Sequence, residues 1–180
     1  VYLTREEFGV RADGLADDTA GIQKAIDRVQ ETTRQGVVFV PEGRYRITKT
    51  VYVWPSIRVI GYGAKRPVFV LGANTAGYGD AAHENYVIFF AGSRPGSGRG
   101  GPAPSPTTRY SGRHGVNVSQ PYDATPGTFY SAMSNIDIEI EDGNPGAAAV
   151  RARYAQHCYL AHMEFRLGSA LAGIRDGGNY

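Results

Sequence analysis

The chain has 180 residues, of which 42% are hydrophobic and 20% charged, and its formal net charge is +2. This is the composition of an ordinary globular unit, and without a dominant Lys/Arg cluster the charge argues against nucleic acid as the main partner. No apolar run approaches the length of a membrane-spanning helix, so no membrane partner is expected.

The first predicted element is an amphipathic helix near residues 18–34. Its apolar residues recur at helical spacing: Ile22, Ile26 and Val29. Asp17 and Asp18 precede it, and either carboxylate can accept hydrogen bonds from the free N–H groups of the first turn. Gly36 is expected to end the helix.

Short β-branched runs follow the helix, separated by Gly, Pro and Asn at turn-like spacing. They occupy residues 37–40, 43–48, 50–54, 57–60, 67–71 and 86–90. No second amphipathic helix of similar length follows, which disfavours a sheet built from alternating strands and helices.

Two of these stretches resemble the start of a known superfamily. Residues 8–26, FGVRADGLADDTAGIQKAI, and residues 36–47, GVVFVPEGRYRI, are similar to the N-terminal region of the pectate lyase superfamily, with its rhamnogalacturonase, epimerase and polygalacturonase-related members. The resemblance covers chiefly residues 5–63. It implies an all-β, single-stranded right-handed parallel β-helix with an N-terminal capping helix. It also implies a polysaccharide partner and a secreted, periplasmic or extracellular location.

One β-helix domain is predicted for residues 1–180, with a capping segment at 5–36 and regular coils over 130–180. Residues 92–127 carry eight of the 24 glycines and six of the ten prolines, and are predicted to form a long insertion. Because members of the resembling family are much longer, the chain is expected to be the incomplete N-terminal part of its domain.

The last third of the chain repeats. Residues 136–140, IDIEI, alternate so that the three isoleucines should point inward and the acids outward. The pattern returns 25 residues later as AHMEF at 161–165, and Val150-Arg151 returns 24 residues later as Ile174-Arg175. A period near 25 is typical of a solenoid, which supports the β-helix independently of the resemblance.

A 25-residue register predicts three outward pairs: Asp137 with His162, Glu139 with Glu164, and Glu141 with Arg166. Carboxylates on adjacent coils, about 4.8 Å apart, raise the pKa of one member, as a general acid requires. Glu139 and Glu164 are therefore the predicted catalytic carboxylates, with Asp176 as a further acid. The alternative is that these charges are solvated and neutralised by their neighbours.

The main functional prediction is a glycoside hydrolase that cleaves a polysaccharide with a carboxylate acid/base pair. One alternative is a calcium-dependent polysaccharide lyase, in which the acids hold the ion and Arg151 or Arg175 is the base. Another is a non-catalytic carbohydrate-binding or tailspike-like module. The Asn-Thr-Asp, Gly-His-Gly and Arg-Ile-Lys motifs of polygalacturonases are absent, so the resemblance transfers no catalytic residue. No cofactor is expected, except calcium in the lyase alternative.

Four residues are predicted to bind substrate. Trp54, Tyr110 and Tyr122 are aromatic residues that could stack on sugar rings, although such residues also pack under loops. Arg113 belongs to the basic insertion, which could meet an anionic sugar such as a uronate.

Overall fold

The computed structural model describes residues 1–95, 121, 123–124 and 127–175. Its helices are α1 (Arg5–Phe8) and α2 (Thr19–Thr32). Its strands are β1 (Asp13–Asp17), β2 (Gly36–Pro41), β3 (Arg44–Ile47), β4 (Val51–Val53), β5 (Ile57–Tyr62), β6 (Val68–Leu71), β7 (Asn85–Phe90), β8 (Ala132–Ser134), β9 (Asp137–Ile140), β10 (Ala147–Arg151), β11 (Tyr159–Ala161), β12 (Phe165–Arg166) and β13 (Ala172–Arg175). Neither α1 nor α2 combines the length and apolar character needed to cross a membrane.

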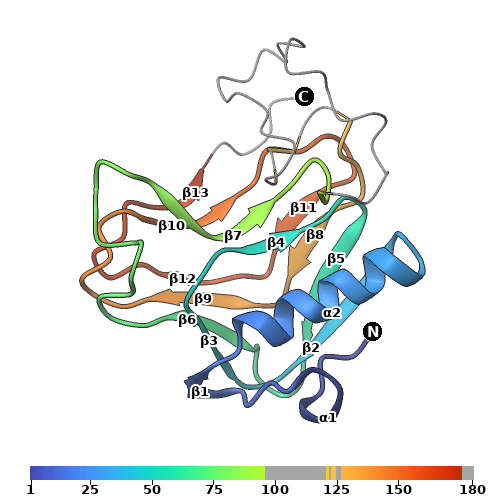
Figure 1. The fold of residues 1–180 in the computed structure, drawn as a ribbon, viewed down its shortest axis with the longest axis horizontal. Coiled ribbons are helices and arrows are strands. Elements are labelled where there is room, and N and C mark those ends of the chain that lie inside the picture. Colours follow the sequence, from blue (N-terminus) through green and yellow to red (C-terminus); the bar gives the residue numbers. More distant parts are fainter. Residues whose placement is uncertain (96–120, 122, 125–126, 176–180) are drawn as a thin grey trace.

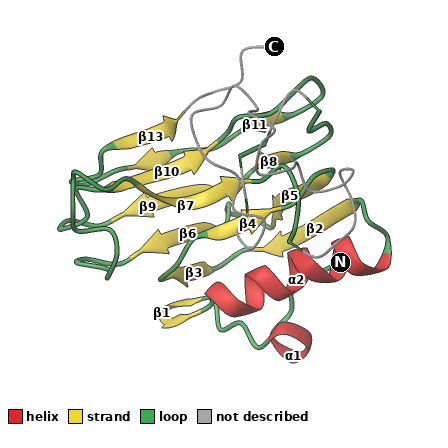
Figure 2. Ribbon diagram, turned by 45° about the horizontal axis from the view of Figure 1, so that its top comes forward, coloured by secondary structure: helices red, strands yellow, loops and turns green. Residues whose placement is uncertain are grey.

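The strands form three parallel sheets that the chain visits in turn. Their orders are β2-β5-β8-β11, β1-β3-β6-β9-β12 and β4-β7-β10-β13. Each group of three consecutive strands from β2 onward therefore makes one coil, and the coils stack on one another (Figures 1 and 2). The predicted parallel β-helix is confirmed, and the six predicted β-branched runs all contain strands.

The coils are not of equal length. Ile138 pairs with Phe165, 27 residues later, whereas Val150 pairs with Ile174, 24 residues later. The predicted spacing of 24 is thus confirmed for the sheet that contains β10, but the predicted spacing of 25 is wrong for the sheet that contains β9. A slip of two residues keeps every side chain on the same face, so the alternation in the sequence could not reveal it.

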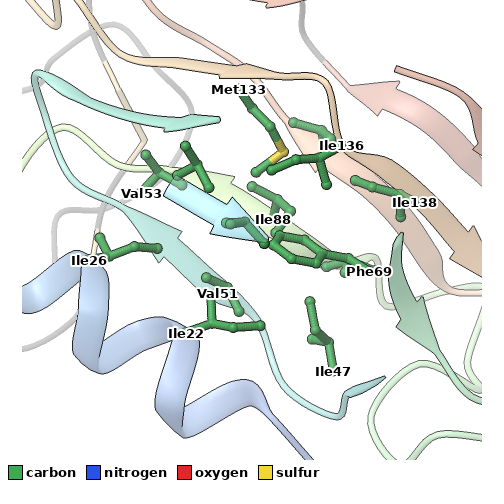
Figure 3. Packing of buried hydrophobic residues seen from close by; sticks show 14 of the residues in the cluster. Ile22, Ile26, Ile47, Val51, Val53, Phe69, Ile88, Met133, Ile136 and Ile138 are labelled. Carbon is green, nitrogen blue, oxygen red and sulfur yellow. The ribbon is translucent and has the colours of Figure 1, made fainter. Parts of the chain in front are cut away.

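Inward-facing side chains of all three sheets meet in one core, which also receives the apolar stripe of α2 (Figure 3). The three isoleucines of the alternating segment are buried there, as predicted: Ile136, Ile138 and Ile140. Burial of such side chains is the main stabilising term of the fold, worth about 1.5–3 kcal/mol for each residue of this size.

Helix α2 covers one end of the coils (Figure 1). Strand β4 lies at the edge of its sheet, and the side-chain amide of Gln23 pairs with both backbone groups of Tyr52 in that strand. Its Nε2 donates to the carbonyl oxygen at 3.1 Å, and its Oε1 accepts from the amide nitrogen at 2.8 Å. The predicted capping helix is confirmed, and it satisfies polar groups that an uncovered edge would expose.

The prediction that Asp17 or Asp18 caps α2 is confirmed for Asp17, and the prediction that Gly36 ends the helix is wrong. The carboxylate of Asp18 does not cap α2, because it accepts hydrogen bonds from the amides of Arg11 (2.6 Å) and Ala12 (3.0 Å) in the preceding loop. Gly36 does not end the helix, which stops earlier, and instead begins β2. Asp17 does accept the amide N–H of the first helical residue, at 3.0 Å.

The predicted insertion falls between β7 and β8. Ala91 and Asp123 form an antiparallel bridge, so these two ends of the segment lie side by side. Most of residues 92–127 lie outside the described residues, and the character predicted for them stays a prediction.

Candidate functional site

The outward face of the sheet β1-β3-β6-β9-β12 carries a group of mutually paired charges. Side chains alternate along β9, so Ile138 faces the core while Asp137 and Glu139 face out. Six residues of this sheet and its edges form ion pairs with one another: Arg44, Arg66, Asp137, Glu139, Glu164 and Arg166. We call this set the charged strip. Figure 1 shows that its strands β3, β6, β9 and β12 lie side by side.

Glu139 is held from both sides by arginines of the charged strip. Arg44 of β3 binds it with two hydrogen bonds, Nη2 to Oε1 at 2.9 Å and Nη1 to Oε2 at 3.2 Å. Arg166 of β12 approaches from the other side, with Nη1 at 3.5 Å from Oε2. The side chain remains 23% exposed, so it is restrained by neighbours on both sides yet still reachable from solvent.

The other two carboxylates share the remaining guanidinium groups. Asp137 is buried, and its Oδ1 accepts hydrogen bonds from Arg66 Nε at 2.7 Å and from the amide of Glu164 at 2.9 Å. Glu164 is exposed and accepts a hydrogen bond from Arg166 Nε at 3.0 Å. Three arginines thus balance three acids, and the charged strip is formally neutral.

The charged strip sets the protonation state of Glu139. The hydrogen bonds from Arg44 lower the pKa of this carboxyl below its ordinary value, and the nearby charge of Arg166 lowers it further, against an opposing effect of burial. Glu139 is therefore held ionised. An ionised carboxylate can act as a base or a nucleophile, but it is the opposite of the raised-pKa general acid.

Replacing Arg44 by glutamine is expected to raise the pKa of Glu139, because the largest cause of its lowering is removed. In the native protein, the lowered pKa contributes stability above the ordinary value of 4.5 that is lost as the pH falls through the folded-state pKa. The Arg44→Gln variant should therefore lose less stability on acidification. Denaturant unfolding at a series of acid pH values measures this. Arg28→Gln, which breaks an ion pair with Glu7 on α1, is the control. Parallel pH profiles for Arg44→Gln and the native protein would contradict the expectation.

The prediction that Glu139 stands beside Glu164 is wrong. Glu139 pairs in register with Arg166, and Glu164 instead lies next to Asp137. All three predicted pairs are displaced by two residues, which also removes Asp137 from His162 and Glu141 from Arg166. The expected repulsion between two carboxylates is thereby replaced by attraction to a guanidinium. Both carboxylates nevertheless contact the same side chain, that of Arg166.

The acids and the base of the lyase alternative do not lie on the same face of the solenoid. Arg151 and Arg175 belong to β10 and β13, in a different sheet from the charged strip. Arg151 binds Asp123 with two hydrogen bonds, at 2.9 and 2.7 Å, and Arg175 binds Glu84 at 2.7 Å. In the part of the chain that the structure describes, no group of three or more His, Cys, Asp or Glu side chains could hold a metal ion.

The prediction that Trp54 is an exposed sugar-stacking residue is wrong. Its side chain is 4% exposed, and its ring stacks on that of Tyr52 with centroids 5.6 Å apart. The indole Nε1 donates a hydrogen bond to Asp27 Oδ1 of α2 at 2.6 Å. Trp54 therefore joins the capping helix to the coils.

Replacing Trp54 by phenylalanine is expected to destabilise the protein by about 1–3 kcal/mol, because a hydrogen bond to a charged acceptor is lost. The predicted binding of polysaccharide should not change, because the Trp54 side chain is buried. Urea unfolding and a binding assay on the same samples check both points. Asp27→Asn is the companion variant: it keeps an acceptor oxygen for the indole but loses the ion pair of Asp27 with Arg94, so it should also lower stability. Loss of binding at unchanged stability would restore a role in stacking on sugars.

Four predicted site residues lie outside the described residues: Asp176, Tyr110, Arg113 and Tyr122. Their predicted roles stay predictions. Conversely, Arg44 and Arg66 belong to the charged strip but were not among the predicted site residues. Arg44 alternates with buried Tyr45, which marks it as outward-facing. The pairing of Arg44 with Glu139 could not be predicted from the sequence repeat, because the insertion between β7 and β8 interrupts the spacing of the coils.

Comparison with known proteins identifies the family. The family model described as rhamnogalacturonase A/epimerase, pectate lyase-like, matches residues 5–174. The chain belongs to this family. A glucan 1,3-beta-glucosidase of Cochliobolus carbonum is 33% identical over 60 residues, which are 33% of this chain and 7% of that protein. The chain therefore spans a small fraction of this relative's length.

Solved structures agree on the fold of this pectate lyase-like chain. The A-module of the Azotobacter vinelandii mannuronan C-5 epimerase AlgE6 superposes with a TM-score of 0.55 at 15% identity, covering 97% of this chain and 40% of the module. An iota-carrageenase complexed to iota-carrageenan fragments superposes with a TM-score of 0.52 at 10% identity, covering 91% and 28%. At these identities the likeness concerns the fold alone.

Proposed function

We propose that the protein containing this chain hydrolyses glycosidic bonds in a polysaccharide and that the charged strip contacts the substrate. The family membership makes the fold that of carbohydrate-active, pectate lyase-like proteins. The observation that carries the proposal is Glu139, a reachable carboxylate held ionised and oriented by two hydrogen bonds from Arg44. A polysaccharide substrate fits a secreted or otherwise extracellular location.

Each residue of the charged strip has a proposed part. Glu139 is the ionised carboxylate that activates water or attacks the sugar, and Arg44 positions it. Glu164 is the most exposed of the three carboxylates around Arg166 and is proposed to protonate the leaving oxygen.

Hydrolysis is favoured over calcium-dependent elimination because the outward acids are already neutralised. A calcium ion would have to compete with three guanidinium groups for the same oxygen atoms. Two carboxylates on one arginine match the needs of hydrolysis more directly, since glycosidases use a pair of acids about the scissile bond.

The experiment is a cleavage screen with two readouts on the protein that contains this chain. The substrates are a soluble β-1,3-glucan, mannuronan, iota-carrageenan and polygalacturonate, chosen from the names of the family and its relatives. New reducing ends report any cleavage, and ultraviolet absorbance reports the unsaturated sugar that a lyase leaves.

Reducing ends without absorbance are the expected result. Absorbance that a chelator abolishes would overturn the proposal in favour of a calcium-dependent lyase. Binding to one of the four polymers without cleavage would instead indicate a carbohydrate-binding module, and trimers in light scattering would favour its tailspike-like form.

A further inference from the structure

Three aromatic side chains form an exposed cluster at the N-terminal end of the solenoid. Tyr2 stacks on Phe39 with ring centroids 5.0 Å apart and planes 23° apart. Tyr62 meets both edge-on, at 6.0 Å from Tyr2 and 6.4 Å from Phe39. Tyr2 is 57% exposed and Tyr62 42%. We call these three residues the aromatic platform.

The platform rests on regular backbone and is not carried by loops. Phe39 and Tyr62 belong to β2 and β5, which are paired neighbours in one sheet (Figure 2). The first residues of the chain extend this sheet: the amide of Phe39 donates to the carbonyl of Val1 at 2.8 Å, and the amide of Leu3 donates to the carbonyl of Phe39 at 2.9 Å. The rings are therefore held in place before any ligand arrives, which lowers the entropic cost of binding.

The size of the platform favours a small ligand unit over a protein. An aromatic side chain buries about 150–250 Å² when fully covered, and these three are already partly covered. The remaining area is well below the roughly 800 Å² per partner of a stable protein interface. A pyranose ring fits better, because its C–H groups form a weakly positive apolar face that matches the negative face of an aromatic ring.

The platform is also close to the charged strip along the chain. Strand β5 ends at Tyr62, and Arg66 of the charged strip follows within the same corner, before β6 begins. The corner of the preceding coil joins β2 of the platform's sheet directly to β3, which carries Arg44. Arg44 and Arg66 thus lie on the same two coils as the platform, one face away, and the acids of the charged strip lie on the next two coils. A long polymer that runs along the solenoid could contact both groups.

We propose that Tyr2, Phe39 and Tyr62 form a stacking subsite for a pyranose unit of the polysaccharide, on the sheet next to the charged strip. The subsite rests on the proposed function in taking a polysaccharide as ligand. Its part is to hold the polymer, and it takes no part in bond cleavage. Loss of the platform should therefore weaken binding of long chains without slowing the cleavage of bound substrate.

The test compares Tyr62→Ala with two matched variants. Tyr62→Phe keeps the ring and should bind normally. Tyr159→Ala removes a 40% exposed tyrosine from β11 of the same sheet, away from β2 and β5, and should also bind normally. Affinity electrophoresis in gels that contain each of the four polymers measures binding, and thermal unfolding confirms that every variant is folded.

The expected result is a roughly tenfold weaker affinity of Tyr62→Ala for at least one polymer, as loss of one stacked ring implies. The turnover rate at saturating polymer should be unchanged. Equal binding by Tyr62→Ala and the native protein would overturn the subsite, whatever the cleavage screen shows. The subsite would also be overturned if the native protein were a dimer and Tyr62→Ala a monomer, because the platform would then be a contact between two copies of the chain. If the native protein binds a polymer more tightly than Tyr62→Ala does but cleaves none of the four, the subsite stands and only the proposed hydrolysis is contradicted.

Discussion

Glutamine in place of Glu139 is expected to lower polysaccharide cleavage about 100- to 10,000-fold, the range measured for removal of a general acid or base. The amide is nearly isosteric and keeps an oxygen that can accept from Arg44, so the fold should persist. It lacks the negative charge that accepts a proton or attacks a sugar carbon. Initial rates of reducing-end release, on the substrate found in the screen, measure the effect.

The control for Glu139→Gln is Glu7→Gln. Glu7 is an exposed carboxylate on α1 that is paired with Arg28, so the chemical change is the same at a distant place. Its rate should match that of the native protein. An undiminished rate for Glu139→Gln would show that the reaction takes place elsewhere in the protein and that the charged strip is structural.

Glu164→Gln separates the proposed parts of the two acids. If Glu164 protonates the leaving oxygen, its loss should slow cleavage of the natural polymer much more than cleavage of a nitrophenyl glycoside, whose acidic phenol leaves as the anion. Glu139→Gln should slow both substrates. Equal losses on both substrates for Glu164→Gln would contradict its part as the acid.

Alanine in place of Gly61 is expected to destabilise the protein by more than about 4 kcal/mol. A Cβ atom at this position would lie 2.0 Å from the carbonyl oxygen of Asn135 and 2.7 Å from the ring of Pro67. Asn135 cannot easily move away, because its side chain donates a hydrogen bond to the carbonyl of Gly61 at 2.7 Å. The clash would push apart two stacked coils at a corner. Denaturant midpoints and circular dichroism report the loss.

Gly79→Ala is the matched control, because its nearest neighbour would lie at 3.9 Å, an ordinary contact distance. Its midpoint should lie close to that of the native protein. A Gly61→Ala protein with a native midpoint would mean that the coils can separate at this corner without cost.

The elements near the N-terminus could be predicted from the sequence because their signals are local. The stripe of Ile22, Ile26 and Val29 is buried as expected, and each β-branched run became a strand. In each case the side chain reports its own position, on one face of a helix or a strand. The details of the cap could not be read in this way, since Asp18 turned out to bind backbone before the helix.

The site could be predicted only in part, because it depends on contacts between coils. Glu139 and Glu164 were correctly taken to face outward, but the length of the coil between them was short by two residues. Arg44 and Glu139 are 95 residues apart in the sequence, and the insertion between β7 and β8 interrupts the repeat that could have related them. The burial of Trp54 could not be predicted, because its contact with α2 leaves no signal in the residues next to it in the sequence.

The bond from Arg44 to Glu139 also has a consequence for how the solenoid comes apart. In the order β3-β6-β9, these two residues sit on strands that are not neighbours, so the bond passes over β6. In a repeat protein whose coils contact only their nearest neighbours, the coils can unfold one at a time from an end. The link between Arg44 and Glu139 ties the first and third coils together, so fraying that starts at β11–β13 should meet added resistance at β9.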